Sequence, residues 1–239
     1  MNLFLGVVSL ILTFSLVVLI EKIFKKEGLY VWIAISTITA NILVCKSIEV
    51  LGITTNLGII MFASTFLATD IMSEKYGSKE SRKAVILGVV SEVIFITMTM
   101  LALNYEPSSI DMSNESMKTL FSINFRVSIS SITMFLISSL LDIYLFEKIK
   151  KKYPNKLWLR NNVATMISNS AENYFFIFFA FVGLYDIGSM LTMATFASLI
   201  EIVVAALDTP FLYLAKLDKV DKLKDRFKLD KITNLKSTY

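Results

Sequence analysis

The chain has 239 residues, 55% of them hydrophobic, and a net charge of +4 with only three prolines and eight glycines. An ordinary soluble domain is about 45–50% apolar, so this composition indicates one membrane domain built of long helices. Histidine is absent and cysteine occurs once, at Cys45. This excludes an internal disulfide, the usual zinc ligand sets and His-based acid–base catalysis. We therefore expect no enzyme, no metal and no cofactor.

The first apolar run, residues 3–20, is predicted to be a retained transmembrane helix. No basic segment precedes it, and it ends in the charged sequence EKIFKK in place of a small-residue cleavage site. A secretory signal peptide would have a basic segment before the apolar run and a small-residue cleavage site after it.

Further apolar runs follow at intervals along the chain. A helix needs about 20 mainly apolar residues to cross a bilayer. The runs that meet or approach this length are 30–51, 57–73, 84–104, 122–146, 162–184 and 189–215. Because lipid offers the backbone no hydrogen-bond partners, an all-α integral membrane protein is expected, a polytopic helical bundle with seven spans. The run 57–73 is short and ends in charge, so a re-entrant segment stays an alternative there.

The basic residues predict the orientation of these spans. All but three of the 24 Lys and Arg residues lie in the segments 21–29, 74–83, 147–161 and 216–239. Basic loops stay in the cytoplasm, which places the N-terminus outside and the C-terminus inside. Residues 1–217 would then form the transmembrane domain, and 218–239 a basic cytoplasmic tail that lies on the anionic inner leaflet. Because topology accounts for this charge, no nucleic-acid partner is expected.

Several ionisable residues interrupt the apolar runs. They are Lys46, Glu49, Asp70, Glu92, Arg126, Asp142, Glu172, Glu201 and Asp208. Each costs at least about 2.5–3.5 kcal/mol near the bilayer centre, so their number predicts a polar cavity among the helices. For residues near span ends, snorkelling or capping is an equal alternative. For the mid-span glutamates, the alternative is a neutral, hydrogen-bonded structural carboxyl.

Helical spacing gathers polar residues on common faces. On the sixth span these are Asn162, Thr165, Asn169, Glu172 and Asn173, and on the fifth Ser128, Ser131, Ser138 and Asp142. Small hydroxyl residues also let helices pack closely, so the second stripe is as well explained by packing. Glu201 and Asp208 share a face of the seventh span, and Asp70 and Glu74 lie one turn apart at the inner end of the third.

Five stretches carry a resemblance to a known family. They are FLATDIMSEKYGSKESRK, FRVSISSITMFLISSLLDIYLF, WLRNN, SNSAENYFFIFFAF and LDTPFLYL. From about residue 30 to 217 the chain resembles the queuosine precursor transporter family of the vitamin uptake transporter group. The most specific piece is the pattern T-D-x-x-x-E-x-Y-G, here Thr69, Asp70, Glu74, Tyr76 and Gly77. The resemblance implies six core helices, with the first span as an N-terminal addition.

The resemblance also implies a function, the uptake of 7-deazaguanine bases by a multi-pass protein of the bacterial plasma membrane. Its partners would be a small-molecule base and the lipid bilayer, and a homodimer is compatible with so small a bundle. The residues expected to bind substrate are Asn41, Lys46, Asp70, Glu92, Arg126, Asp142, Asn169, Glu172 and Glu201. Those expected to gate or support the site are Glu74, Arg160, Asn161, Asn162 and Asp208.

Three positions depart from the family pattern. Ser139 stands where the family usually has Gln, Glu172 where it has Asp, and Glu201 where many members carry Lys. With these changes, the predicted spans contain seven acidic residues and only two basic ones, Lys46 and Arg126. We therefore expect a preference for a cationic precursor, the aminomethyl base or queuine, over the uncharged cyano base.

Two other functions stay open at this point. The chain could be the substrate-binding membrane subunit of a vitamin importer with separate ATPase partners, since it has no G-x-x-x-x-G-K-[ST] loop of its own. It could also be an integral-membrane enzyme that uses paired carboxylates for acid–base chemistry, although no nucleophile–base set is visible.

Overall fold

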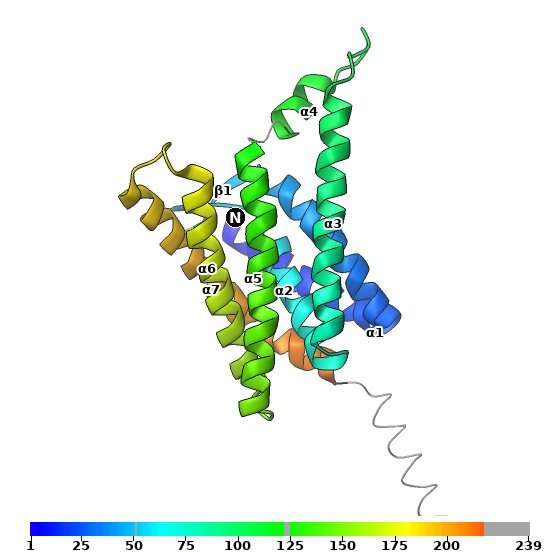
Figure 1. The fold of residues 1–239 in the computed structure, drawn as a ribbon, viewed down its shortest axis with the longest axis vertical. Coiled ribbons are helices and arrows are strands. Elements are labelled where there is room, and N and C mark those ends of the chain that lie inside the picture. Colours follow the sequence, from blue (N-terminus) through cyan, green and yellow to red (C-terminus); the bar gives the residue numbers. More distant parts are fainter. Residues whose placement is uncertain (51, 122–124, 218–239) are drawn as a thin grey trace, which may run out of the picture.

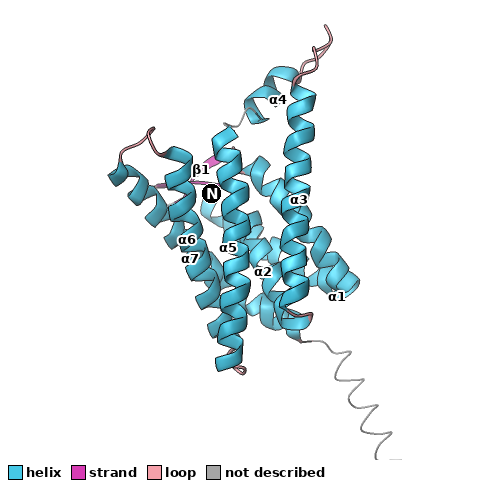
Figure 2. Cartoon of the chain, in the orientation of Figure 1, coloured by secondary structure: helices cyan, strands magenta, loops and turns pink. Residues whose placement is uncertain are grey.

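The computed structural model describes residues 1–50, 52–121 and 125–217, which form a bundle of long helices (Figure 1). Very little of the described chain lies outside helices, and its one sheet is a short hairpin (Figure 2). The elements are α1 (Asn2–Leu43), β1 (Ser47–Val50), β2 (Ile53–Asn56), α2 (Gly58–Lys75), α3 (Ser78–Leu103), α4 (Asn114–Phe121), α5 (Phe125–Lys152), α6 (Leu157–Phe181) and α7 (Ile187–Lys216). This architecture is that of a helical membrane protein. The predicted tail, 218–239, lies outside the described residues.

Helix α1 bends sharply at Lys25, where φ is 57° and ψ is −139°. Positive φ is unfavourable for a residue with a Cβ, so packing around the bend must hold it. Gly28 permits that packing, because a Cβ placed there would lie 2.6 Å from Cγ2 of Ile20 and 2.8 Å from its carbonyl oxygen. The first two predicted spans are therefore two arms of α1, and the loop expected at 21–29 is a kink.

The second predicted span ends earlier than its apolar run. Helix α1 stops at Leu43, and β1 then pairs antiparallel with β2. The prediction that a helix runs to residue 51 and carries Lys46 and Glu49 was wrong. Both are exposed, Lys46 in the turn before β1 and Glu49 in the strand. The β-branched residues of 47–56 favour a strand, and Gly52, with φ +80°, makes the tight turn that a helix would not contain.

Helix α2 forms the centre of the bundle. Its residues 63–73 are buried without interruption. Leu67 and Ile71 belong to a core cluster that also contains Phe14 and Ile33 of α1 and Leu212 of α7. A helix covered on all sides needs no lipid-facing apolar stripe. This explains why the run 57–73 was the shortest of the predicted spans.

Four described helices are long and apolar enough to cross a membrane by length and composition alone: α1, α3, α5 from Ile129 onward, and α7. Helices α2 and α6 carry many of the interior polar residues and pack among the others. In Figure 1, α3, α5 and α6 run alongside one another, with α2 behind them. The total of seven crossings stays a prediction.

The predicted cytoplasmic segments gather at one end of the molecule. Lys26 pairs with Glu80 at 3.4 Å, and Glu74 pairs with Lys150 at 3.2 Å and with Lys216 at 2.7 Å. Helix α4 and the α6–α7 turn lie toward the opposite end (Figure 1). This grouping agrees with the topology derived from basic residues, while the side of the membrane that each end faces stays a prediction.

Candidate functional site

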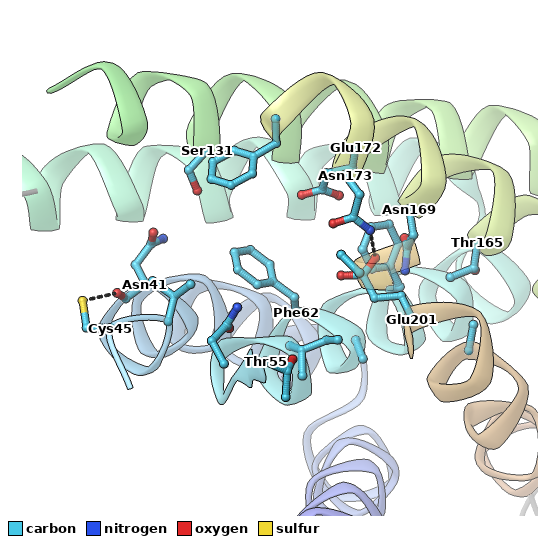
Figure 3. Close-up of a pocket in the computed structure, with 18 of the residues that line it drawn as sticks. Asn41, Cys45, Thr55, Phe62, Ser131, Thr165, Asn169, Glu172, Asn173 and Glu201 are labelled. Atoms are coloured by element: carbon cyan, nitrogen blue, oxygen red, sulfur yellow. Dashed lines mark hydrogen bonds between the residues drawn. The ribbon is translucent and has the colours of Figure 1, made fainter. Parts of the chain in front are cut away.

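A cavity of about 360 Å³ lies among the helices (Figure 3). Cavities of about 300–1,000 Å³ are typical of small-molecule sites. Its polar lining consists of Asn41, Thr55, Asn56, Thr99, Ser131, Thr165, Asn169, Glu172, Asn173, Glu201 and Asp208. Three carboxylates but no Lys or Arg stand among the described lining residues. The described part of the lining is therefore acidic.

Exposure of the lining falls from one end of the cavity to the other. Cys45, beside the hairpin, is exposed, and Thr55 of β2 is half-buried. Thr165 and Asp208 are each 1% exposed. The cavity thus has its mouth at the hairpin end and its floor toward the end where the basic segments gather.

Two glutamates from neighbouring helices form the wall of the cavity. Asn173 donates through Nδ2 to Oε2 of Glu201 at 2.7 Å, and Ser138 donates through Oγ to Oε2 of Glu172 at 2.5 Å. Figure 3 shows the first of these bonds beside Asn169. Within the described part of the chain, the other oxygen of each carboxylate accepts no hydrogen bond. Among the described residues, each glutamate is thus oriented by one donor, and its second oxygen has no donor there.

Aromatic rings surround these acids. The rings that line the cavity are Phe62, Phe66, Phe95, Phe121 and Phe176. Near Glu172, Phe176 alone of the five aromatic residues at 174–179 faces the cavity. The others, Tyr174, Phe175, Phe178 and Phe179, are 40–54% exposed on the outer face of α6. Four of these five aromatic side chains thus point away from the interior.

Three aspartates from three helices meet at the floor. Asp208 lines the cavity and accepts a bond from Nδ2 of Asn161 at 2.6 Å. Asp142 accepts from Oγ1 of Thr165 at 3.1 Å and lies within hydrogen-bonding reach of Asp70. Asp70 and Asp142 are both fully buried and stand behind the floor rather than on it. The structure thus brings together acids that are far apart in the sequence.

Beyond the floor, Glu74 joins four helices at their ends. Its carboxylate pairs with Arg160 of α6 at 2.5 Å and, as above, with Lys150 of α5 and Lys216 of α7. Burial acts to raise the pKa of Glu74, but the hydrogen bond from Lys216 and the charges of Lys150 and Arg160 outweigh it, so the pKa lies below its ordinary value. Glu74 is therefore ionised at neutral pH and ties α2 to three other helices.

The T-D-x-x-x-E-x-Y-G pattern lies along this closed end. Asp70 belongs to the floor, Glu74 to the ion pairs, and the Tyr76 hydroxyl donates to Oε1 of the buried Glu21 at 2.7 Å. The carbonyl of Thr69 accepts from Oγ of Ser81 at 2.9 Å. Thr69, Glu74 and Tyr76 thus each bond to residues of neighbouring helices.

Of the remaining predicted site residues, some line the cavity and others lie away from it. Asn41 lines the cavity near its mouth and donates through Nδ2 to Oε1 of Glu92 at 2.5 Å, while Glu92 is buried behind it. Lys46 is exposed and does not line the cavity. Asn162 bonds to Thr209 at 2.7 Å, away from the lining. Arg126 falls in the first turn of α5, and its side chain lies outside the described part of the structure.

The sequence did not single out several residues that shape the site. They are Phe62, Phe66, Phe95 and Thr209 in the interior, Glu21 at the kink, and Lys150 and Lys216 on Glu74. The two lysines could not be separated from other basic residues that mark topology. The phenylalanines had no signal that distinguishes a cavity wall from an apolar core.

Fold and cavity together define a multi-pass helical membrane protein with a polar site among its helices. Residues 56–215 match the family model described as "Putative vitamin uptake transporter". The chain is also 38% identical over 209 residues to the "Probable queuosine precursor transporter" of Bacillus subtilis (strain 168), an alignment that covers 86% of this chain and 91% of that relative. The chain therefore belongs to this transporter family, and the resemblance read from its sequence is confirmed. No solved structure matches it significantly.

Proposed function

We propose that the chain imports queuosine precursors, 7-deazaguanine bases, through this cavity. The observation that carries the proposal is the pair Glu172 and Glu201 on the cavity wall, among aromatic rings, each with one oxygen that accepts no bond from the described residues. A deazaguanine presents a ring N–H and an exocyclic amine on one edge, and a carboxylate can accept both. The amide of Asn169 could donate to the base carbonyl, and phenylalanine faces suit a flat ring.

The charge of the lining supports a narrower choice among these bases. Glu172, Glu201 and Asp208 line the cavity, and the described lining offers no basic residue to balance them. A protonated amine would gain charge-assisted hydrogen bonds there, whereas a nitrile would not. The favoured substrate is therefore the base 7-aminomethyl-7-deazaguanine, or queuine, rather than 7-cyano-7-deazaguanine.

The direction of transport follows from the two unlike ends of the cavity. The mouth lies at the hairpin end, which the positive-inside pattern places outside the cell, and the Glu74 ion pairs lie beyond the floor. Release to the cytoplasm would require these pairs to part while the mouth closes. Glu74, Arg160 and their partners would thus act as the inner gate of a carrier in the bacterial plasma membrane.

Growth of a queuosine-auxotrophic host that expresses the chain tests this function. Each precursor is supplied singly, and the modified nucleoside is measured in tRNA. The aminomethyl base or queuine should restore the modification at lower concentration than the cyano base, and an empty vector should restore none. Absence of rescue by all three, with the protein present in the membrane, would contradict the proposal.

Purified chain in liposomes separates an autonomous carrier from the capture subunit of an importer. Uptake of labelled base without other proteins is expected of the carrier. High-affinity binding without uptake, followed by uptake once ATPase partners are added, would favour the importer.

A further inference from the structure

Two carboxylates behind the cavity floor, Asp70 and Asp142, have no part in the recognition of the base proposed above. We propose that Asp70, Asp142 and Asp208 form a proton-binding site that couples the proton gradient to movement of the solute. The inference rests on the proposed function for the identity of that solute. The site itself is argued from hydrogen-bond accounting, from charge and from position.

The floor holds more acceptors than donors. Ionised carboxylates only accept hydrogen bonds, and the donors supplied here are Asn161 to Asp208 and Thr165 to Asp142. Among the described residues, no hydrogen-bond donor is placed on either oxygen of Asp70, on Oδ2 of Asp142 or on the amide oxygen of Asn161, and all four atoms are buried. Asn161 is fully buried, and its amide is held against Asp208. A protonated carboxyl would supply the donor that this arrangement lacks.

Charge leads to the same conclusion. Asp70 lies within hydrogen-bonding reach of Asp142, and both lie close enough to Asp208 to repel it. Carboxylates that share a buried site cannot all be ionised. The side chains that act on Asp70 are Asp142 from α5, Thr165 from α6 and Asp208 from α7, and none of these is a cation.

Four basic residues of this end are paired with other acids. Lys150, Arg160 and Lys216 pair with Glu74, and Lys75 pairs with Glu21 at 2.8 Å. Among the described residues, no group of three acidic or Cys side chains is arranged to hold a metal ion. The missing positive charge is therefore assigned to a proton rather than to a metal.

Position connects this site to both ends of the transport path. Asp208 lines the cavity, so it can take a proton from water that enters at the mouth. Asp70 lies one helical turn before Glu74, and Asn161 follows Arg160 directly. One proton binds a carboxylate oxygen from the outer side and leaves to the inner side when the Glu74 pairs part. The proton gradient drives this cycle, and no other co-reactant is needed.

The test uses the full chain in liposomes with equal potassium on both sides and valinomycin, so that the membrane potential is zero. With the outside more acidic by one pH unit, labelled base should accumulate several-fold above its equilibrium level, and a protonophore should abolish this. Exchange of labelled for unlabelled base, measured without a pH gradient, reports binding and transport of the base without proton-driven accumulation. Because the structure places Asp70 behind the floor and not on the cavity lining, Asp70→Asn should lose gradient-driven accumulation and keep exchange within about twofold. Asp111→Asn, on an exposed loop, serves as the matched control and should keep both.

The outcomes separate this inference from the proposed function. Accumulation that ignores the pH gradient, or that persists unchanged in Asp70→Asn, overturns the proton site and leaves transport intact. Loss of exchange and accumulation together, in both Asp70→Asn and Asp208→Asn, assigns the acids a structural role and also overturns it. A wild type that neither binds nor exchanges any deazaguanine overturns the proposed function itself.

Discussion

Glu201 sits on the α7 wall of the cavity, at a position where the resembled family often has lysine. Its Oε2 is held by Asn173, and its other oxygen accepts no bond from the described residues. A lysine there would present donors and a positive charge to the same space. The residue at 201 is therefore one of the three described carboxylates that contribute charge to the cavity lining.

Glu201→Gln should change which base is carried more than how much is carried. A hydrogen bond to a charged group contributes about 1.5–3 kcal/mol, and a neutral one about half of that. The uptake ratio of aminomethyl to cyano base should therefore fall by about tenfold, because 1.4 kcal/mol corresponds to a factor of ten. Competition between the two labelled bases in liposomes measures it. Ser131→Ala, a neutral change on the same cavity wall, should leave the ratio unchanged. An unchanged ratio in Glu201→Gln would contradict the cationic preference.

Much of this site could be predicted from single residues and their spacing. Thr165, Asn169, Glu172 and Asn173 recur at three- and four-residue steps, and the structure places all four on the cavity wall. Spacing reports only which residues share a helix face. It could not show that Asp70 would meet Asp142, because that contact depends on how α2 and α5 pack together.

At the scale of the elements, the ends of four helices depend on Glu74. Arg160 is 1% exposed, and its guanidinium also lies 5.3 Å from the centre of the Phe146 ring. Its Nη1 donates to the carbonyl of Pro154 at 2.7 Å. Removing the carboxylate would therefore leave a buried cation without its charge partner.

Glu74→Gln should destabilise the protein by about 3 kcal/mol at neutral pH, since breaking a buried ion pair leaves an unpaired charge. The folded-state pKa of Glu74 is lowered. The stabilisation is thus fully present above the ordinary pKa of 4.5 and is lost as pH falls through the lower folded value. Thermal unfolding in detergent between pH 7 and pH 3 should show the variant and wild type converging below pH 4.5. Glu115→Gln, at the exposed pair with Lys118, should show no difference at any pH. A difference in melting temperature between Glu74→Gln and wild type that stays constant from pH 7 to pH 3 would contradict the role of the ionised Glu74 carboxylate.

The kink of α1 gives a second prediction at this scale. Gly28→Ala should destabilise the protein by about 1–3 kcal/mol, because its Cβ would overlap Ile20. Gly6→Ala provides the matched control in the same helix, since a Cβ there meets no atom within 4 Å. It should stabilise the helix by about 0.5–1 kcal/mol. Equal melting temperatures for the two variants would show that the arms of α1 do not pack as described.

The elements themselves were largely predictable, with three exceptions: the hairpin, the kink, and α4, whose residues lie outside the apolar runs. Apolar runs identified the helices because lipid demands helical backbone at these positions. The hairpin at 47–56 was missed because a short apolar run with β-branched residues fits a helix end as well as a strand. The kink at Lys25 was missed because it depends on contacts between the two arms rather than on a local helix breaker.

At the scale of the whole molecule, one orientation is required by every proposal above. The mouth of the cavity must face outward, and the Glu74 end must face the cytoplasm. The chain contains a natural reporter of this arrangement, because Cys45 is its one cysteine and stands exposed at the mouth. Asn155, in the turn between α5 and α6, is exposed at the other end.

A membrane-impermeant maleimide should therefore label Cys45 in right-side-out spheroplasts, and Cys45→Ser should abolish the labelling. Asn155→Cys in the Cys45→Ser background should be labelled only after permeabilisation, because a basic loop stays inside. Since Cys45 lines the cavity, saturating base should slow its labelling, while a cysteine at Asn155 should be labelled at the same rate with and without base. The opposite topology would be shown if Asn155→Cys were labelled in sealed spheroplasts and Cys45 of the wild type were labelled only after lysis. The proton and the base would then have to enter from the cytoplasmic side, which the import of a scavenged precursor does not allow.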